Sequence, residues 1–231
     1  MVFGNKIINP ETKVMLKIEN FELERVYENT FLGVKMDPNF NWKPQVKHVH
    51  SKISKGIGVM RKVKRFLNHK SMCTLYNSLI LPHLSYCAEI WGNTYKTTLD
   101  PIEKIQKKAI RIVNDAGYLD HTTPLFIKCK ALKFADIVQL KTAQIVFRAR
   151  HNLLPENLQT LFQNRDGRYE LRRAMNFKHP RARINVKEYS VSVCGVKLWN
   201  SLPESLQQSG TESQFKRKFK KMAIEKYKCE E

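Results

Sequence analysis

The chain has 231 residues, enough to bury a core in one or two domains without disulfides or metal ions. Hydrophobic residues make up 42% of the sequence and aromatic residues 10%, which excludes collagen and a fully disordered polymer. The formal net charge is +20, since 41 lysines and arginines face 21 aspartates and glutamates; a field of that sign attracts nucleic acid first and an anionic membrane surface second.

The sequence carries no signal for a membrane or for export. Its apolar runs, such as Leu79–Leu81, are far too short to span a bilayer, and the first residues lack the apolar core of a signal peptide. Five widely spread cysteines are typical of reduced thiols. We therefore expect an intracellular protein, nuclear or cytoplasmic, with no membrane partner. A basic globular protein that touches no nucleic acid stays open as an alternative.

The first 36 residues predict a small antiparallel β-sheet. Two short runs with partial alternation, residues 14–18 and 21–26, are separated by a plausible hairpin turn. A third run, residues 30–36, ends at a turn signal that begins with Asp37. Within this run, Gly33 would allow a bulge or a close backbone approach.

From Trp42 the apolar residues recur about every 3.6 positions, which predicts an amphipathic helix. No acidic residue occurs between Asp37 and Glu89, and cations occupy most positions off the apolar stripe. We expect these cations to contact phosphates. The stripe consists of Val46, Val49, Ile53, Ile57, Met60 and Leu67. The candidate nucleic-acid-binding residues are Lys47, Lys52, Lys55, Arg61, Lys62 and Arg65.

The remaining pattern predicts a mainly α fold, in which the short N-terminal β segment precedes a helical bundle and a basic, partly extended C-terminal region. Residues 70–81 predict a mostly buried helix that ends near Pro82. The helices expected after it start at Thr98 or Asp100 with Pro101 in the first turn, at Thr122 or Thr123, at Ala135, near Leu154, and at the capping box Thr211–Gln214. Residues 163–187 are rich in arginine and predict a linker or extended arm. The expected divisions are residues 1–40, 41–162 and 163–231.

The sequence offers no convincing catalytic or metal site. Phosphate-binding loops and common hydrolase motifs are absent, and the aspartates are scattered, with Asp37 expected to be a turn residue. A zinc site drawn from Cys73, His83 and Cys87 lacks a fourth ligand, and Cys87 lies in an apolar run typical of a core thiol. We therefore expect no catalytic residue, metal, cofactor or small-molecule substrate in this chain.

Three basic zones interleave cations with aromatic side chains that could stack on bases or could belong to the core. We expect Phe66, Phe215 and Phe219 to be core residues. The segment Lys216–Lys221 could also be a nuclear localisation signal. The zones are Lys43–Lys70, Arg165–Lys187 and Lys216–Lys228.

Several segments resemble the part of non-LTR (LINE-type, jockey-like) retrotransposon reverse transcriptases that follows the polymerase palm. The similarity covers essentially the whole chain and is most specific at residues 75–112 and 169–203. The segments that carry it are Phe31–Asp37 (Phe-Leu-Gly-Val-Lys-Met-Asp), Trp42, Ile53–Lys55, Leu75–Cys87, Trp91–Asn93, Ile105–Ile112 and Lys197–Pro203 (Lys-Leu-Trp-Asn-Ser-Leu-Pro).

The resemblance implies a primer grip at Phe31, Leu32 and Gly33, a hairpin that positions the primer end. It implies a thumb in the helices after Trp42, which clamps the template-primer duplex of RNA or DNA through its backbone. The catalytic aspartates of the family, which use Mg²⁺, are expected to lie outside this chain, which would then be a C-terminal fragment without polymerase activity. Two alternatives stay open, a stand-alone (domesticated) nucleic-acid-binding protein and an interaction module whose basic faces are merely solvated.

Overall fold

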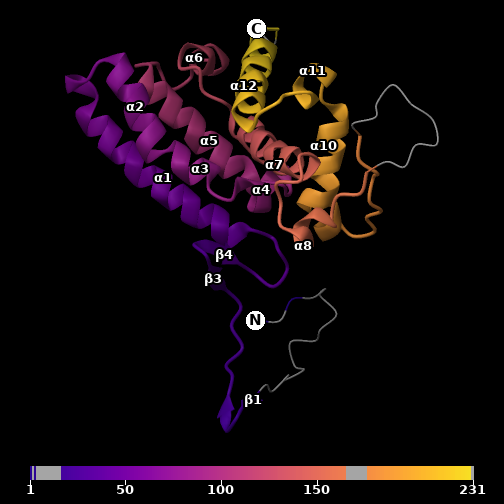
Figure 1. Cartoon of the computed structure of the whole chain (residues 1–231). Helices are drawn as coiled ribbons and strands as arrows, with labels where there is room; N and C mark the ends of the chain where they lie inside the picture. Colours follow the sequence, from indigo (N-terminus) through magenta and orange to yellow (C-terminus); the bar gives the residue numbers. More distant parts are fainter. Residues whose placement is uncertain (2, 4–16, 165–175, 230–231) are drawn as a thin grey trace.

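The computed structural model describes residues 1, 3, 17–164 and 176–229 and shows a mainly helical protein (Figure 1). Two short antiparallel strand pairs precede the helices, so the predicted fold class is confirmed. No described helix is both long enough and apolar enough to cross a membrane. All five cysteines are free thiols, as expected.

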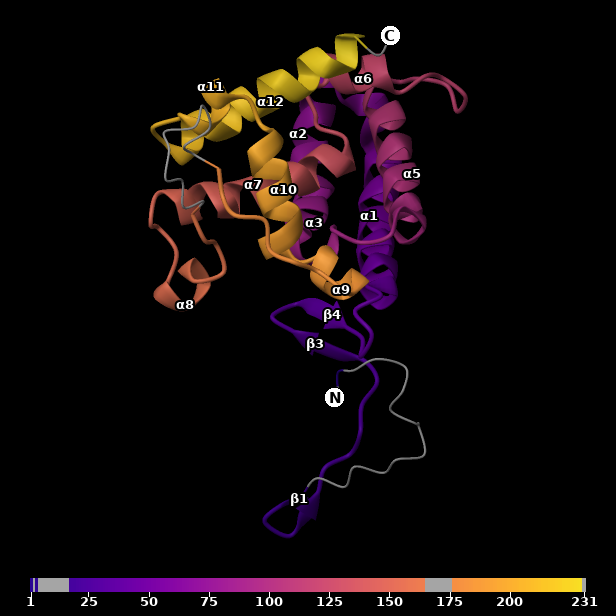
Figure 2. The same cartoon turned by 90° about the vertical axis from the view of Figure 1, so that its right-hand side faces the viewer.

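The strands form two separate pairs, which corrects the prediction of one sheet. In the first pair, β1 (Lys17–Ile18) faces β2 (Phe21–Glu22), and this pair stands away from the helical body (Figures 1 and 2). In the second, β3 (Asn29–Phe31) faces β4 (Val34–Met36). The prediction of a single strand over residues 30–36 was wrong because the chain reverses at Leu32 and Gly33. Residues 14–16 of the first predicted run lie outside the described residues.

The entry to the first helix is organised by Asp37. Its buried carboxylate accepts hydrogen bonds from the backbone N–H groups of Asn39 (3.3 Å), Asn41 (3.1 Å) and Trp42 (3.0 Å). Trp42 has a left-handed backbone (φ 61°), and helix α1 (Lys43–Val63) begins directly after it. The prediction that Asp37 is a turn residue is therefore confirmed.

The predicted apolar stripe of α1 is buried from Val46 to Met60. Leu67 is the exception, since α1 ends at Val63 and a 3-10 turn, η1 (Lys64–Phe66), follows. The main neighbour of α1 is α5 (Lys96–Val113). The N-terminal turns of both helices line one groove and their C-terminal ends are joined by the ion pair Lys64–Asp115, so α1 and α5 run parallel (Figure 2).

The helices that follow α1 differ from expectation in two ways. Helix α2 (His69–Leu79) buries only Met72 and Tyr76, because it covers the bundle with one face, so the prediction of a mostly buried helix was wrong. Helix α2 ends at Leu79, close to Pro82 as predicted, and Pro82 itself lies in the first turn of α3 (Leu81–Ser85), where its missing N–H is tolerated. Helix α4 (Ala88–Trp91) follows, and α5 begins at Lys96, before the predicted caps, with Pro101 inside it.

The C-terminal half packs onto α7 (Phe134–Arg150), which the sequence predicts within one residue. An aromatic cluster forms the contact, in which Phe215 lies 5.2 Å from Phe147 and 5.9 Å from Trp199 between ring centroids. The other elements here are α6 (Thr123–Lys128), α8 (Glu156–Gln159), α9 (Asn185–Glu188), the π-helical turn η2 (Val191–Gly195), α10 (Val196–Ser201), α11 (Glu204–Gln207) and α12 (Glu212–Cys229).

Helix α12 starts at the predicted cap, where the N–H of Gln214 donates to the Thr211 hydroxyl (3.2 Å). The predicted arm, residues 163–187, lies partly outside the described residues. Its described ends include a β-bridge between Asn164 and Phe177, whose ring is buried. Buried residues before and after residue 162 belong to one hydrophobic core, and the expected division of the chain stays a prediction.

Candidate nucleic-acid interface

Helix α1 exposes the predicted cations because its buried stripe turns them outward. The exposed set is Lys47, Lys52, Lys55, Arg61, Lys62 and Arg65, of which Arg65 lies on η1. At 100° per residue, Lys47 and Arg61 lie on the flank toward α5, Lys55 and Lys62 face outward, and Lys52 lies on the opposite flank. The five side chains on α1 therefore spread over the whole exposed half of the helix.

Within the part of the chain that the structure describes, none of these six cations forms an ion pair with a carboxylate. The local sequence contributes to this, since it has no acidic residue between Asp37 and Glu89 and so places no carboxylate on α1 beside these cations. Cations without protein counter-charges keep their full attraction for phosphate.

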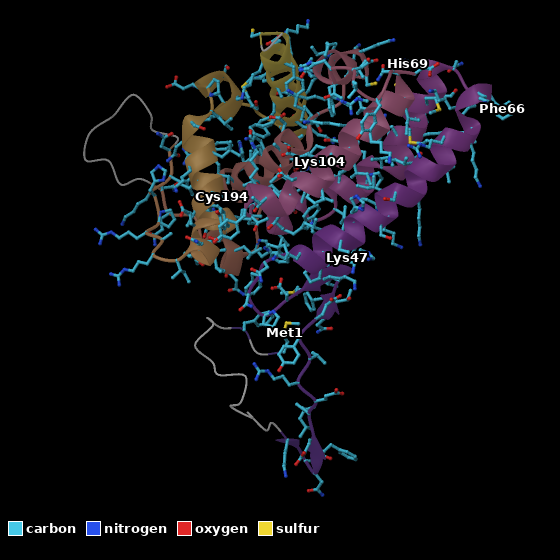
Figure 3. All side chains as sticks on the ribbon, turned by 180° about the vertical axis from the view of Figure 1, so that it is seen from behind. Met1, Lys47, Phe66, His69, Lys104 and Cys194 are labelled. Carbon is cyan, nitrogen blue, oxygen red and sulfur yellow. The ribbon has the colours of Figure 1, made fainter. Side chains whose placement is uncertain are left out.

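Helix α5 adds a second row of cations beside α1, which are not among the candidate residues predicted from the sequence. Lys104, Lys107 and Lys108 are exposed there. Pro101 and Thr97 of α5 line an open groove with Lys47 and other residues of α1, and Lys104 and Lys108 continue the row of Pro101 at helical spacing. Figure 3 shows Lys47 and Lys104 on the same side of the molecule.

Phe66 lies at the end of this surface and is 84% exposed, so the expectation that it is a core residue was wrong. The apolar stripe passes through Met60 and would continue at Leu67, which leaves Phe66 on the solvent side of the turn. Its neighbour in sequence is the exposed Arg65. Phe215 and Phe219, by contrast, are fully buried as expected.

The candidate primer-grip residues form the tip of the β3–β4 hairpin. Leu32 (φ 47°) and Gly33 (φ 77°) are the two central residues of a type I′ turn, which requires positive φ at both positions. Phe31 is 62% exposed and Leu32 is 75% exposed. The hydroxyl of Tyr86 donates to the Leu32 carbonyl (2.6 Å), so the helical body holds an apolar tip that faces solvent.

The histidines of α1 lie on different flanks, as their spacing predicts. His50 lines the groove beside α5, whereas the neighbours of His48 include Lys52, Lys35 and His83. Burial, followed by these positive neighbours, lowers the pKa of His48 below its usual 6.5. This shift favours the uncharged form of His48.

The other two basic zones contribute less to this surface. Residues 165–175 of the second zone lie outside the described residues. In the third zone, α12 exposes Lys216, Arg217 and Lys221 while Phe215 and Phe219 face the core. Figure 2 shows α12 across the top of the bundle, whereas α1 and α5 run side by side below it. The use of Lys216–Lys221 as a localisation signal stays a prediction.

Metal-binding side chains are grouped differently from the combination weighed in the sequence. Cys73 lies next to His69 and Cys129, and not in a group with His83 and Cys87. Among the described residues this is the one group of three or more potential ligands, and it contains no carboxylate.

The chain is similar to the "Probable RNA-directed DNA polymerase from transposon BS" of Drosophila melanogaster, with 24% identity over 164 residues. The aligned part makes up 68% of this chain and 18% of the transposon protein, so the chain spans a small share of that relative. No family model and no solved structure matches the chain. The similarity supports a relationship between this chain and retrotransposon reverse transcriptases.

Proposed function

We propose that this chain is the template-primer-binding part of a non-LTR retrotransposon reverse transcriptase, and that α1 and α5 form its contact with the nucleic-acid backbone. The observation that carries the proposal is the surface of α1 and α5, two parallel helices that share a groove at their N-terminal turns and expose cations along their length. Phosphates would bind along this surface with little dependence on base sequence, since lysines and arginines on a regular helix contact the backbone.

The hairpin supports the same function at the N-terminal end of α1. In the proposal, Phe31, Leu32 and Gly33 contact the primer strand with the exposed tip of the β3–β4 hairpin. A hairpin tip that positions a primer needs a fixed place in the structure, and the hydrogen bond from the Tyr86 hydroxyl to the Leu32 carbonyl fixes it. The apolar tip would then contact the sugars and bases of a duplex, and the cationic helix would contact the phosphates of the same duplex.

We further propose that polymerase chemistry belongs to residues outside this chain. Two-metal nucleotidyl transfer needs carboxylates that hold two cations a few ångströms apart. The one group of three or more potential ligands among the described residues consists of histidine and cysteine. Pure protein should therefore give no primer extension with Mg²⁺ or Mn²⁺, and steady extension would contradict this part of the proposal.

The binding role is tested by the salt dependence of affinity. Each phosphate contact contributes about 0.9 to the slope of log K against log salt for duplex DNA. Lys52→Ala with Lys55→Ala on α1, and Lys104→Ala with Lys108→Ala on α5, should each flatten the slope by up to about two units. The measurement titrates each protein against one labelled template-primer duplex at several salt concentrations.

The matched control removes the same charge elsewhere. Lys17 and Lys197 are exposed and pair with Glu22 and Glu188, respectively, so Lys17→Ala with Lys197→Ala should leave the slope unchanged. Equal slopes for the wild type and the three double variants, with circular dichroism showing all four proteins folded, would mean that α1 and α5 are only solvated surfaces. If the control variant flattened the salt slope as much as the α1 and α5 variants do, the effect would come from net charge alone.

A further inference from the structure

We propose that His69, Cys73 and Cys129 form a binding site for a zinc-class divalent ion, independent of the nucleic-acid surface. Two helical segments meet at this point. His69 is the first residue of α2, Cys73 lies one turn later on the same face, and Cys129 directly follows α6. All three side chains are partly buried, which limits competition from water.

The distances between the ligand atoms fit tetrahedral zinc. The Sγ atoms of Cys73 and Cys129 are 3.9 Å apart, and Nε2 of His69 lies 3.8 Å from the first and 3.9 Å from the second. Bond lengths of about 2.3 Å to sulfur and about 2.0 Å to nitrogen give tetrahedral edges of about 3.8 Å between two sulfur atoms and about 3.5 Å between sulfur and nitrogen. An ion can therefore enter with shifts of a few tenths of an ångström.

Asn114, at the C-terminal end of α5, supports the site from the side. Its Nδ2 donates to Sγ of Cys129 (3.1 Å) and to the Ile110 carbonyl (2.9 Å), which fixes the amide beside the Cys129 sulfur. Its Oδ1 lies 3.1 Å from Nε2 of His69. Three protein ligands leave a fourth position for a water molecule or for this amide oxygen.

The ligand set selects the type of ion. Two thiolates and an imidazole suit zinc and similar soft or borderline ions, whereas Mg²⁺ requires oxygen ligands. Two thiolates also balance the charge of a divalent ion. The consequence for the fold is a cross-link that ties the end of α6 to α2 and closes the exposed loop after Asn114, in which Tyr118 and Leu119 are almost fully solvated.

The test uses the full chain, purified with a thiol reductant, stripped of metal and then titrated with zinc or cobalt. We expect one zinc per chain and, with cobalt, the charge-transfer and visible bands of a tetrahedral site with thiolate ligands. His69→Ala, Cys73→Ser and Cys129→Ser should each weaken binding by at least about 100-fold, and Asn114→Ala by about 10-fold. Bound zinc should also raise the melting temperature of the wild-type chain.

The control is Cys194→Ser, a partly buried thiol far from His69 (Figure 3), which should bind zinc as the wild type does. Zinc binding that survives Cys73→Ser with Cys129→Ser would overturn the proposal, as would a reduced wild-type chain that takes up no zinc. A Cys73–Cys129 disulfide in a chain whose reduced form binds no metal would assign the pair to redox chemistry. The cobalt spectrum of the wild type decides the ligand types even if a variant fails to fold.

Discussion

Tyr86 and Leu32, 54 positions apart in the chain, are joined by a hydrogen bond of 2.6 Å from the tyrosine hydroxyl to the leucine carbonyl. The backbone of Tyr86 is fixed in turn, since its carbonyl accepts from the indole N–H of the buried Trp91 (2.9 Å). The ring of Tyr86 also lies against Gly33, with its nearest atom 3.6 Å from where a Cβ would stand. The helical body thus sets the position of the hairpin tip.

Tyr86→Phe should loosen the hairpin tip without unfolding the bundle. The lost bond is partly solvated, so we expect a cost of about 0.5–1 kcal/mol, confined to the hairpin. Hydrogen exchange of the β3–β4 amides should become faster, whereas exchange in α5 should not change. Tyr118→Phe, in an exposed loop, is the control, and slower or unchanged exchange in the hairpin would show that Tyr86 does not hold it.

Phe66→Ala should weaken binding of single-stranded or frayed nucleic acid and leave stability intact. A base that stacks on an aromatic ring contributes about 1–3 kcal/mol, so we expect a loss of at least about fivefold in affinity. Because Phe66 is 84% exposed, its removal should change the free energy of unfolding by less than about 0.5 kcal/mol. Fluorescence titration and urea denaturation measure the two quantities, and Phe66→Trp should retain binding. Unchanged affinity for Phe66→Ala would place the ring outside the interface.

Gly56 and Gly58, two positions apart in α1, should respond differently to alanine. A Cβ at Gly58 meets no atom within 4 Å, so Gly58→Ala should gain helix propensity and stabilise the fold by about 1 kcal/mol. A Cβ at Gly56 would lie 2.9 Å from Cδ1 of the fully buried Ile80 and 3.3 Å from the Leu79 carbonyl. Gly56→Ala should therefore be about 1–3 kcal/mol less stable than Gly58→Ala. Equal stabilities in urea denaturation would argue against close packing of α1 on α2.

Gln106→Leu should be strongly destabilising, since the buried amide of Gln106 joins three elements. Its Nε2 donates to the Tyr76 hydroxyl (3.0 Å) and to the Leu132 carbonyl (2.9 Å), and its Oε1 accepts from the N–H of Phe134 (2.8 Å). Leucine would leave a buried N–H and a buried carbonyl without partners, at a cost of about 2–5 kcal/mol. Thermal and urea denaturation measure the loss. Gln139→Leu, at an exposed position of α7, is the control and should change stability by less than about 0.5 kcal/mol.

Local patterns predicted helices α1, α7 and α12 and the exposure of the cations on α1. The stripe of α1 is a matter of helical periodicity, and the exposure of Lys47 to Lys62 follows from it, because positions off the buried stripe must face solvent. The cap at Thr211 and the turn at Asp37 were likewise visible, since both depend on side chains that bond to backbone only a few residues away. Such interactions leave their signal within a short window of sequence.

Contacts between segments that are distant in the chain could not be predicted from local sequence patterns. The prediction for Phe66 failed because its burial depends on where α1 ends, and Leu32 breaks a predicted strand although it has no strong turn preference. Cys73 was weighed as a ligand with neighbours in sequence, whereas its partner Cys129 lies 56 positions away. Three features result from the packing of side chains that are far apart in the chain: the alignment of α5 beside α1, the contact of Tyr86 with the hairpin, and the His69–Cys73–Cys129 group. Short-range periodicity and capping carry no information about such packing.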